Sequence, residues 1–492
     1  MSGFPFDTVL IANRGEIALR ILRTVRKLGL RGAVVYHAVD ARAPAVAAAD
    51  IAIEITGATP VAAYLDGAQI IEKAVANGVQ GIHPGYGFLS ENAGFARAVA
   101  EAGLVFIGPA PDTIELMGDK VRARNFVAAR GFPVAPSAIE DDDPATFAAR
   151  ARAVSSPLLI KPAAGGGGKG MRIVRDLAVL DEELERARSE GQRYFGDGRL
   201  YVERYVERPR HIEVQVLGDA HGHVVHLFER ECSIQRRFQK IIEESPSPGL
   251  TPQERKEICT VAAGIARAAN YKNAGTVEFI YGQGQFYFLE MNTRLQVEHP
   301  VTEEITGLDL VAEQLRIAAG APLGFEQDQV ETRGHAIELR LYAEDPARGF
   351  TPTTGRILAY HPPADVRVDS GINAGAPVTP AFDPMLAKLI VHGEDRAEAI
   401  AKAHQALHDF VLLGCTTNAG FLARLLRDPD FVAGHLQTGL IDEKPALAAE
   451  PALDDKTLIK LLGVAASALK PITDAADAVP TLHNTLGAWR NR

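Results

Sequence analysis

The sequence predicts an α/β region at the N-terminus, an α+β region in the middle and a third, smaller region after it. The length of 492 residues corresponds to about three domains of about 100–200 residues each. Strand and helix patterns alternate over the first hundred residues, which implies an open parallel sheet. A glycine-rich turn between two strands and a series of antiparallel strand patterns follow, and these favour an α+β arrangement.

The first region, residues 1–118, reads as strand–helix–strand units. Residues 8–12 are a short apolar run, and apolar residues then recur at helical spacing from Ile17 to Leu28, where Gly29 ends the helix. Further on, the pattern predicts strands at 33–36 and 104–107 and a helix at 91–102.

The second region, residues 119–333, begins with a helix at 119–130. Two strands, at 157–161 and 171–174, flank the glycine-rich turn. The strands that follow are interpreted as antiparallel. They are expected at 200–206, 211–217, 223–228, 275–281 and 286–290.

The third region, residues 334–446, is expected to contain strands at 335–342 and 385–391 and a helix at 397–411. The tail, residues 447–492, is rich in alanine and has one weak helix around 458–469. With so little to bury, the tail is interpreted as a docking or linker segment, and the alternative is a frayed terminus without a partner.

Composition and charge exclude several classes of protein. With 47% apolar and 23% charged residues, the chain is neither disordered nor fibrous. The net charge of −10 argues against a nucleic-acid partner. The three cysteines form no CxxC pair, which argues against a zinc site and against a disulfide framework. No signal-peptide pattern and no run of about 20 apolar residues occurs, so we expect a cytoplasmic protein without a membrane partner.

The most conspicuous segment is KPAAGGGGKG at residues 161–170. Successive glycines let backbone N–H groups approach phosphate oxygens closely. The segment contains a GxGxxG match, but a strand follows it where a dinucleotide fold requires a helix, and Met171 stands where a P-loop requires lysine. A flexible flap over a triphosphate fits best, and the alternative is a mobile surface hairpin.

A pair of carboxylates forms the second signal. Glu278 and Glu290 lie in two apolar strands joined by a short loop. A three-residue turn centred on Gly284 would place the two side chains directly opposite each other, an unfavourable arrangement that a bound cation relieves. Asn292 follows on the same face. Two carboxylates and an amide oxygen are typical ligands of Mg²⁺ carried with a nucleotide, and the alternative is a pair of solvated surface acids.

The third signal extends that strand. Glu290, Asn292, Arg294, Gln296 and Glu298 would share one face of an extended chain. Arginine offers two parallel hydrogen bonds to a small planar anion, and Glu298 could act as a general base. The alternative is an ion-pair ladder with a structural role.

Six segments of the chain resemble the biotin carboxylase family of ATP-grasp enzymes, over residues 7 to about 446. They are IANRGEIA at 11–18, HPGYGFLSEN at 83–92, MGDK at 117–120, ECSIQRR at 231–237, EMNTRLQVEHPVTE at 290–303 and RLYAEDP at 340–346. The resemblance implies an N-terminal parallel-sheet (pre-ATP-grasp) domain, an ATP-grasp domain with a mobile glycine-rich lid at about 134–204, and a C-terminal biotin carboxylase domain.

Residue roles follow from the resemblance. It implies that ATP is bound by Lys120, Lys161, Gly166, Gly167, Gly168, Glu203, Val206, His211 and Gln235, with the Val206 backbone at the adenine. It implies that Mg²⁺, or Mn²⁺ in its place, is held by Glu278, Glu290 and Asn292. The bicarbonate site is implied at Arg294, Gln296 and Val297, with Glu298 as the base. Arg340 is implied to stabilise the biotin enolate, with Lys240 and Tyr86 nearby.

The implied reaction is carboxylation of biotin by ATP and bicarbonate through carboxyphosphate. Biotin is expected on a carrier domain, either on another polypeptide or on a segment outside this sequence, because none of the five methionines begins a Met-Lys-Met motif. The other expected partners are a carboxyltransferase and, with it, an oligomeric carboxylase complex. The tail resembles that of acyl-CoA carboxylase α chains, although the final acceptor cannot be read from the sequence.

Two other functions fit the same fold. A catalytically inert ATP-binding protein would have lost Arg294, Glu298 or Arg340, and all three are present. An ATP-grasp ligase that joins a carboxylate to an amine would not require the RLQVEHP run at 294–300.

Overall fold

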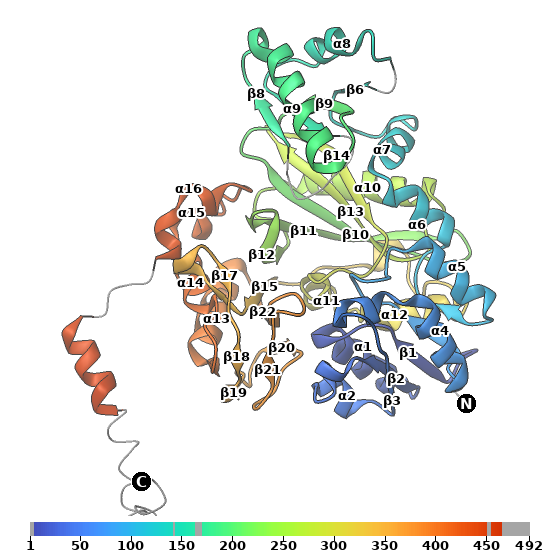
Figure 1. Ribbon diagram of the computed structural model, residues 1–492, viewed down its shortest axis with the longest axis vertical. Helices are drawn as coiled ribbons and strands as arrows, with labels where there is room; N and C mark the ends of the chain where they lie inside the picture. Colours follow the sequence, from blue (N-terminus) through green and yellow to red (C-terminus); the bar gives the residue numbers. More distant parts are fainter. Residues whose placement is uncertain (1–3, 141–142, 163–169, 450–453, 465–492) are drawn as a thin grey trace, which may run out of the picture. The chain divides into compact units, whose positions relative to one another are not determined.

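The N-terminal region folds around a parallel sheet because short apolar strands alternate with amphipathic helices. The computed structural model describes residues 4–140, 143–162, 170–449 and 454–464. Residues up to Leu447 form one unit and the residues after it a second. Within the first unit the N-terminal sheet has the strand order β3-β2-β1-β4-β5, and all of its neighbours pair in parallel. The parallel sheet predicted from the alternating pattern is therefore confirmed (Figure 1).

The elements of this region follow each other closely along the chain. Its strands are β1 (Thr8–Ile11), β2 (Arg31–Tyr36), β3 (Ile51–Glu54), β4 (Gly81–His83) and β5 (Val105–Phe106). Its helices are α1 (Gly15–Lys27), α2 (Pro44–Ala48), α3 (Pro60–Leu65), α4 (Gly67–Ala76) and α5 (Ala93–Glu101). The longest, α1, buries Ile17, Ile21 and Val25 on one face, as their helical spacing predicts. The structure starts this helix just after Asn13, whose amide donates to the carbonyls of Pro84 and Tyr86.

Two helices, α6 (Pro111–Gly118) and α7 (Lys120–Ala128), lead to a small lobe that we call the lid lobe, residues 137–204. Its antiparallel sheet has the order β6-β9-β7-β8, and it packs against α8 and α9 through buried aliphatic residues. In Figure 1 this lobe stands at the top of the molecule. Its elements are β6 (Ser137–Ile139), α8 (Phe147–Ala153), β7 (Leu158–Pro162), β8 (Arg172–Val174), α9 (Leu180–Phe195) and β9 (Leu200–Arg204).

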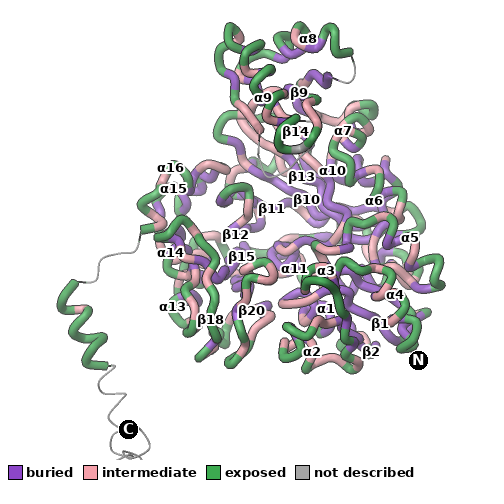
Figure 2. Tube along the Cα trace, viewed as in Figure 1, coloured by how far each residue is buried: buried purple, intermediate pink, exposed green. Residues whose placement is uncertain are grey.

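An eight-stranded antiparallel sheet is the largest sheet among the described residues of the first unit. Its order is β14-β13-β10-β11-β12-β15-β22-β20, so it runs from the middle of the chain into the C-terminal region. The strands are β10 (Arg210–Gly218), β11 (Val224–Arg236), β12 (Gln239–Ser245), β13 (Asn273–Gly282), β14 (Gln285–Asn292), β15 (His335–Tyr342), β20 (Arg367–Ser370) and β22 (Met385–Gly393). Figure 2 shows its central strands as buried, which explains why charged side chains on them require partners.

Helices pack against this sheet. Helix α10 (Pro252–Ala268) packs on β10 and β11, and Ile258, Ala262 and Ile265 are its buried residues in this core. Helices α11 (His299–Thr306) and α12 (Leu310–Ala318) follow β14, and α12 packs against α1 of the N-terminal region. The C-terminal region adds α13 (Arg396–Asp409), α14 (Ala419–Leu425), α15 (Pro429–Val432) and α16 (Leu440–Glu443).

Short two-stranded sheets complete the C-terminal region. They pair β16 (Glu344–Asp345) with β17 (Thr351–Pro352), β18 (Gly355–Arg356) with β21 (Pro377–Val378), and β19 (Ala359–His361) with β23 (Val411–Leu413). In the second unit, a helix spans residues 455–464 and exposes apolar side chains, among them Ile459 and Val464. Within the described residues, no helix is long and apolar enough to cross a bilayer.

Candidate active site

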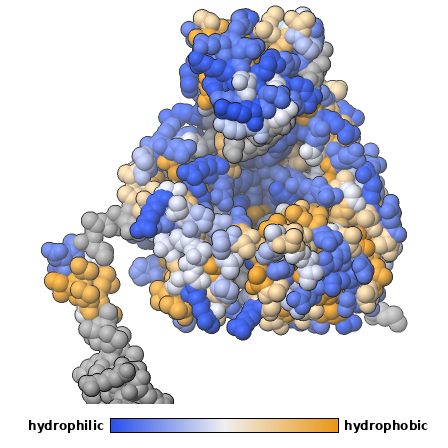
Figure 3. Space-filling view, in the orientation of Figure 1, coloured by the Kyte–Doolittle hydropathy of each residue, from blue (hydrophilic) through white to orange (hydrophobic). Residues whose placement is uncertain are grey.

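A cavity of about 810 Å³ lies where the N-terminal region, the eight-stranded sheet and the loop after β14 meet. Figure 3 shows this side of the molecule as a hydrophilic hollow below the lid lobe. Eleven of the side chains singled out in the sequence line it: Tyr86, His211, Lys240, Glu278, Glu290, Asn292, Arg294, Gln296, Val297, Glu298 and Arg340. Residues spread over more than 250 positions of the chain are thereby brought into one site.

The β13–β14 hairpin places two carboxylates face to face. Glu278 pairs directly with Glu290, as expected, but the turn is shorter than expected. Gly282 pairs with Gln285, so only Gln283 and Gly284 form the turn, both with positive φ as a tight hairpin of this kind requires. A bulge in β14 between the pairs of Phe279 and Glu278 adds one residue and restores the opposition.

The predicted continuation of that strand is wrong. Strand β14 ends at Asn292, and the chain then forms an irregular loop up to the start of α11. The side chain of Leu295 is fully buried, and Pro300 in the first turn of α11 suits the start of a helix rather than a strand. The polar side chains of this loop still line one cavity, because the loop wraps around it.

Glu278 is the most heavily bonded carboxylate of the site. Its oxygens lie 2.7 Å from His211 Nε2 and 3.1 Å from Lys240 Nζ. They also accept hydrogen bonds from the amides of Asn292, at 2.6 Å, and Gln296, at 2.7 Å. Burial alone would raise the pKa of Glu278, but Lys240 and His211 outweigh it and hold that pKa well below its ordinary value.

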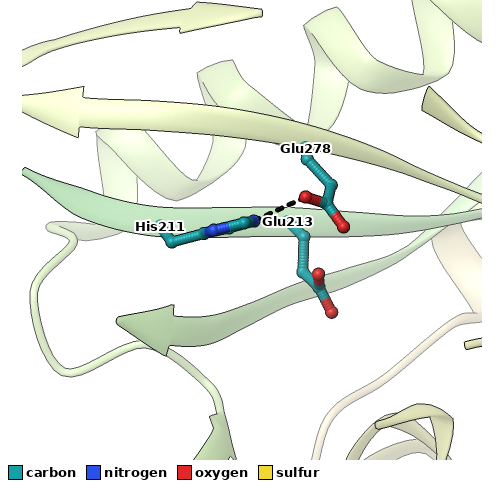
Figure 4. A group of neighbouring side chains, drawn as sticks. All are labelled: His211, Glu213 and Glu278. Atoms are coloured by element: carbon teal, nitrogen blue, oxygen red, sulfur yellow. Dashed lines mark ion pairs between the residues drawn. The ribbon is translucent and has the colours of Figure 1, made fainter. Parts of the chain in front are cut away.

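Lys240 lies at the centre of three carboxylates. Its ammonium is 2.6 Å from Glu213, 3.1 Å from Glu278 and 2.5 Å from Glu298. Burial would lower the pKa of Lys240, yet these three anions raise it well above the ordinary value, so the side chain stays charged. Figure 4 shows His211 and Glu213 on β10 beside Glu278 on β13. Since the ammonium of Lys240 lies between Glu213 and Glu278, we assign this trio to an ion-pair network rather than to a metal.

Glu278, Glu290 and Asn292 bring oxygen atoms together at one end of the β13–β14 hairpin, so they could hold a magnesium ion. Asn292 Nδ2 lies 2.6 Å from Glu278, and Glu290 stands across the hairpin. Glu290 pairs with Lys120 at 2.9 Å, so a cation already stands beside that carboxylate. Two carboxylates and a carboxamide are hard oxygen donors, and they fit Mg²⁺.

Glu298 lies just before α11, deep in the cavity. One of its oxygens contacts Lys240 and the other accepts a hydrogen bond of 2.9 Å from Arg340. Burial would raise its pKa, but Lys240 and Arg340 hold the pKa of Glu298 far below the ordinary value. Glu298 is therefore ionised at neutral pH, which is the form a proton acceptor requires.

Arg340 connects Glu298 to a second buried carboxylate that the sequence did not single out. Its Nη2 lies 2.9 Å from Glu298 and 2.5 Å from Glu243. Burial raises the pKa of Glu243 to about 7, although Arg340 lowers it. Glu243 follows Ile241 and Ile242 in β12 and precedes Glu244, so the available signal was a pair of acids directly after two isoleucines.

The loop after β14 is held from both sides. Arg294 Nε donates to Glu91, at 3.0 Å, and its Nη2 donates to Asn292, at 2.9 Å. The amide of Gln296 lies between Glu278 and the fully buried Arg230, whose Nη2 donates to Gln296 Oε1 at 2.5 Å. The sequence analysis did not single out Arg230. The feature that could have identified it was an arginine in the interior of a predicted strand.

The remaining predicted nucleotide residues lie outside the cavity lining. Lys161 pairs with Glu203 inside the lid lobe, and Gln235 contacts His211 Nδ1 at 2.8 Å. Val206 lines a separate small hollow beside Gly282. Gly166, Gly167 and Gly168 lie outside the described residues.

Three family models match consecutive parts of the chain. "Biotin carboxylase, N-terminal domain" matches residues 5–114, and "Biotin carboxylase C-terminal domain" matches residues 338–443. The model "Carbamoyl-phosphate synthase L chain, ATP binding domain" matches residues 119–326 between them.

Several curated proteins align with most of the chain. The biotin carboxylase of Allochromatium vinosum is 47% identical over 433 residues, covering 87% of this chain and 96% of its own length. A pyruvate carboxylase component of Methanothermobacter thermautotrophicus is 46% identical over 441 residues, covering 89% of this chain and 90% of its own length. The α chain of mitochondrial methylcrotonoyl-CoA carboxylase from Glycine max is 47% identical over 441 residues, and the alignment spans 60% of that longer protein.

Solved structures agree in fold with the first unit. The biotin carboxylase domain dimer of 2-oxoglutarate carboxylase from Hydrogenobacter thermophilus, in complex with MgADP, ADP and bicarbonate, has a TM-score of 0.84 and 42% identity. It covers 91% of this chain and 99% of the domain. With family models along its length and relatives matched over nearly their full length, this chain belongs to the biotin carboxylase family.

Proposed function

We propose that this chain carboxylates biotin at the expense of ATP, with bicarbonate as the carbon source. The observation that supports this most is the position of Glu298, between Lys240 and Arg340 and in the same cavity as Glu278, Glu290 and Asn292. A proton acceptor, a metal-binding carboxylate pair and an anion-binding arginine within one cavity are the groups that activation of bicarbonate by a triphosphate requires.

The first half of the reaction joins bicarbonate to the γ-phosphoryl group of ATP. Arg294, Gln296 and the backbone at Val297 would hold the bicarbonate, and Glu298 would take its proton. The bicarbonate oxygen then forms a bond to the γ-phosphorus, the bond to ADP breaks, and carboxyphosphate results. Glu278, Glu290 and Asn292 would hold Mg²⁺, which neutralises charge on the phosphates when bound.

The second half transfers the carboxyl group to biotin. Carboxyphosphate releases CO₂ and phosphate, the phosphate accepts the proton of biotin N1, and the new N–C bond forms at that nitrogen. Arg340 would stabilise the negative charge that develops on the ureido oxygen of biotin, and Tyr86 lies across the same cavity. Lys240 stays charged throughout, because three carboxylates surround it, and would attract the carboxyphosphate anion.

Biotin is proposed to arrive on a carrier domain. A biotin-dependent carboxylase needs a carboxyltransferase as well, and we propose one that acts on an acyl-CoA. The relationship to the methylcrotonoyl-CoA carboxylase α chain supports an acyl-CoA, whereas relatives named for pyruvate and 2-oxoglutarate make these the competing acceptors. The relative crystallised as a dimer supports a dimer of this chain.

The function is tested by ADP release from the purified protein with Mg²⁺ and ATP. We expect release to require bicarbonate and to rise when free biotin is added, with label from bicarbonate recovered in carboxybiotin. The Glu298→Gln variant serves as the matched inactive control. ADP release that ignores bicarbonate would contradict the proposal and favour another ATP-grasp ligase. Supplying a biotinylated carrier with carboxyltransferases for acyl-CoA, pyruvate or 2-oxoglutarate then identifies the acceptor.

A further inference from the structure

A row of charged side chains crosses the buried face of the C-terminal half of the eight-stranded sheet. Lys388 of β22 pairs with Arg340 of β15 on one side and with Asp369 of β20 on the other. Directly paired residues of an antiparallel sheet point to the same face, so these three side chains lie side by side. Lys388 is fully buried, and a buried ammonium requires several partners.

The two neighbouring cations hold two successive residues of the loop after β14. Lys388 Nζ donates to the carbonyl oxygen of Val297 at 2.7 Å. Arg340 Nη2 donates to the carboxylate of Glu298 at 2.9 Å. The peptide between Val297 and Glu298 is planar and trans, so its C=O and N–H point in opposite directions. The hydrogen bond from Lys388 to the carbonyl therefore also sets the direction of the N–H of Glu298.

Lys388 also reaches the N-terminal region. Its Nζ lies 3.2 Å from Glu16 Oε1, and the hydroxyl of Tyr86 donates to the same carboxylate. Glu16 and Tyr86 both line the cavity, whereas Lys388 stands behind it. One ammonium thus connects the loop that carries Val297 with the side of the cavity that carries Tyr86.

We propose that Lys388 is a positioning residue that holds the loop of residues 293–298 in its bicarbonate-binding shape and, through Glu16, sets the direction of the Tyr86 hydroxyl. The inference rests on the proposed function, because it names the residue that keeps the bicarbonate side and the biotin side of one site in register. Lys388 itself touches no substrate.

The surroundings of Lys388 keep its charge in place. Burial would lower the pKa of Lys388, but Glu16, Glu338 and Asp369 raise it overall, against an opposing effect of Arg367. Arg367 is bound in turn to Asp369 at 2.9 Å. A charged donor on a carbonyl makes a stronger and more directional contact than a neutral one.

The test compares Lys388→Met with Lys402→Met. Lys402 is a half-exposed lysine of α13 whose Nζ also donates to a backbone carbonyl, that of His392 at 3.0 Å, away from the site. For Lys388→Met we expect the KM for bicarbonate to rise about tenfold or more, as for the loss of one charge-assisted hydrogen bond, with the KM for ATP within about twofold. Amide hydrogen exchange over residues 293–298 should speed up as well. Lys402→Met should change neither.

Two further variants keep the test decisive if Lys388→Met is unstable. Lys388→Gln keeps a donor for the Val297 carbonyl and should recover part of the bicarbonate KM. Glu16→Gln leaves Lys388 in place and should raise the KM for biotin more than that for bicarbonate. Unchanged exchange and an unchanged bicarbonate KM in folded Lys388→Met would overturn the inference, as would an equal rise in the KM for bicarbonate and the KM for ATP. A wild-type protein without bicarbonate-dependent ADP release would contradict the proposed function instead.

Discussion

Glu278 of β13 stands directly opposite Glu290 of β14, and a bulge of one residue in β14 produces this pairing. Two facing carboxylates repel each other in a sheet. His211 and Lys240 neutralise the first, and Lys120 neutralises the second. Each carboxylate thus has positively charged partners of its own. The carboxylate oxygens together form a cluster of donors that suits a divalent ion.

The carboxylate pair predicts a specific change in metal dependence. Glu290→Gln removes one anionic ligand, so the Mg²⁺ concentration needed for half-maximal ADP release should rise about tenfold or more, with a lower maximal rate. The measurement is a Mg²⁺ titration at fixed ATP. Glu257→Gln, an exposed change on α10, should behave as wild type. A Glu290→Gln enzyme with an unaltered Mg²⁺ curve would falsify the assignment.

Glu298 and Arg340 should have separable roles. Glu298→Gln removes the proton acceptor and should abolish bicarbonate-dependent ATP cleavage, a loss of about 100-fold or more. Arg340→Ala should lower carboxylation of biotin more than ATP cleavage, because its partner charge develops on biotin. Both activities are measured on each variant, as ADP release and as label fixed from bicarbonate. Equal loss of the two activities in both variants would refute this division.

Glu243 should make stability depend on pH. Its pKa is about 7 in the folded protein against 4.5 for an ordinary glutamate. Between these pH values the folded protein holds a proton that the unfolded chain has released, so stability falls as the pH rises through this window. In Glu243→Gln this position no longer titrates, so the variant does not share the loss of stability. The difference in Tm, variant minus wild type, should therefore increase from pH 5 to pH 8. Parallel Tm curves for the two proteins across that window would contradict the prediction.

Arg230 should be one of the most costly residues to remove. It is fully buried and donates hydrogen bonds to Glu213, Gln215, Thr276, Gln296 and Thr302. Arg230→Met leaves Glu213 buried without this partner, and we expect a loss of about 3–5 kcal/mol in the free energy of unfolding. Urea unfolding measures it, with exposed Arg42→Met as the control. A loss below about 1 kcal/mol would show that the network tolerates its absence.

Biotin should enter the site from another chain or segment. None of the five methionines is followed by lysine, so the sequence has no Met-Lys-Met attachment site. Intact-mass measurement after incubation with a biotin ligase, biotin and ATP should therefore show no added biotin, while a separate biotinylated carrier should be carboxylated. A biotin adduct on this chain, or rejection of all carriers by an enzyme that turns over free biotin, would refute the prediction.

The sequence predicted the elements that local patterns encode. The helical spacing of Ile17, Ile21 and Val25 placed α1, and the strand predicted at 335–342 matches β15. The opposition of Glu278 and Glu290 was also predicted, although from a three-residue turn. A two-residue turn and a bulge give the same pairing, and a bulge is difficult to recognise because no residue type is specific to it.

The sequence predicted poorly what depends on long-range packing. The alternation from Glu290 to Glu298 looked like a strand, but β14 ends at Asn292 and the chain turns into α11 at His299. Arg230, Glu243 and Lys388 stand in strand interiors, where periodicity assigns them to a face but does not name their partners. Those partners come from strands and loops tens of residues away along the chain.

The hydrogen bonds between β12 and β15 join the middle of the chain to its C-terminal region within a single sheet. Cutting the chain near residue 333 would separate β12 from β15. The exposed edge of β12 would then have unpaired backbone groups that can associate with other chains. It would also separate Glu243 from Arg340. The two regions therefore lie in one compact unit, and a chimera that exchanges the C-terminal region between relatives has to preserve the pairing of β12 with β15.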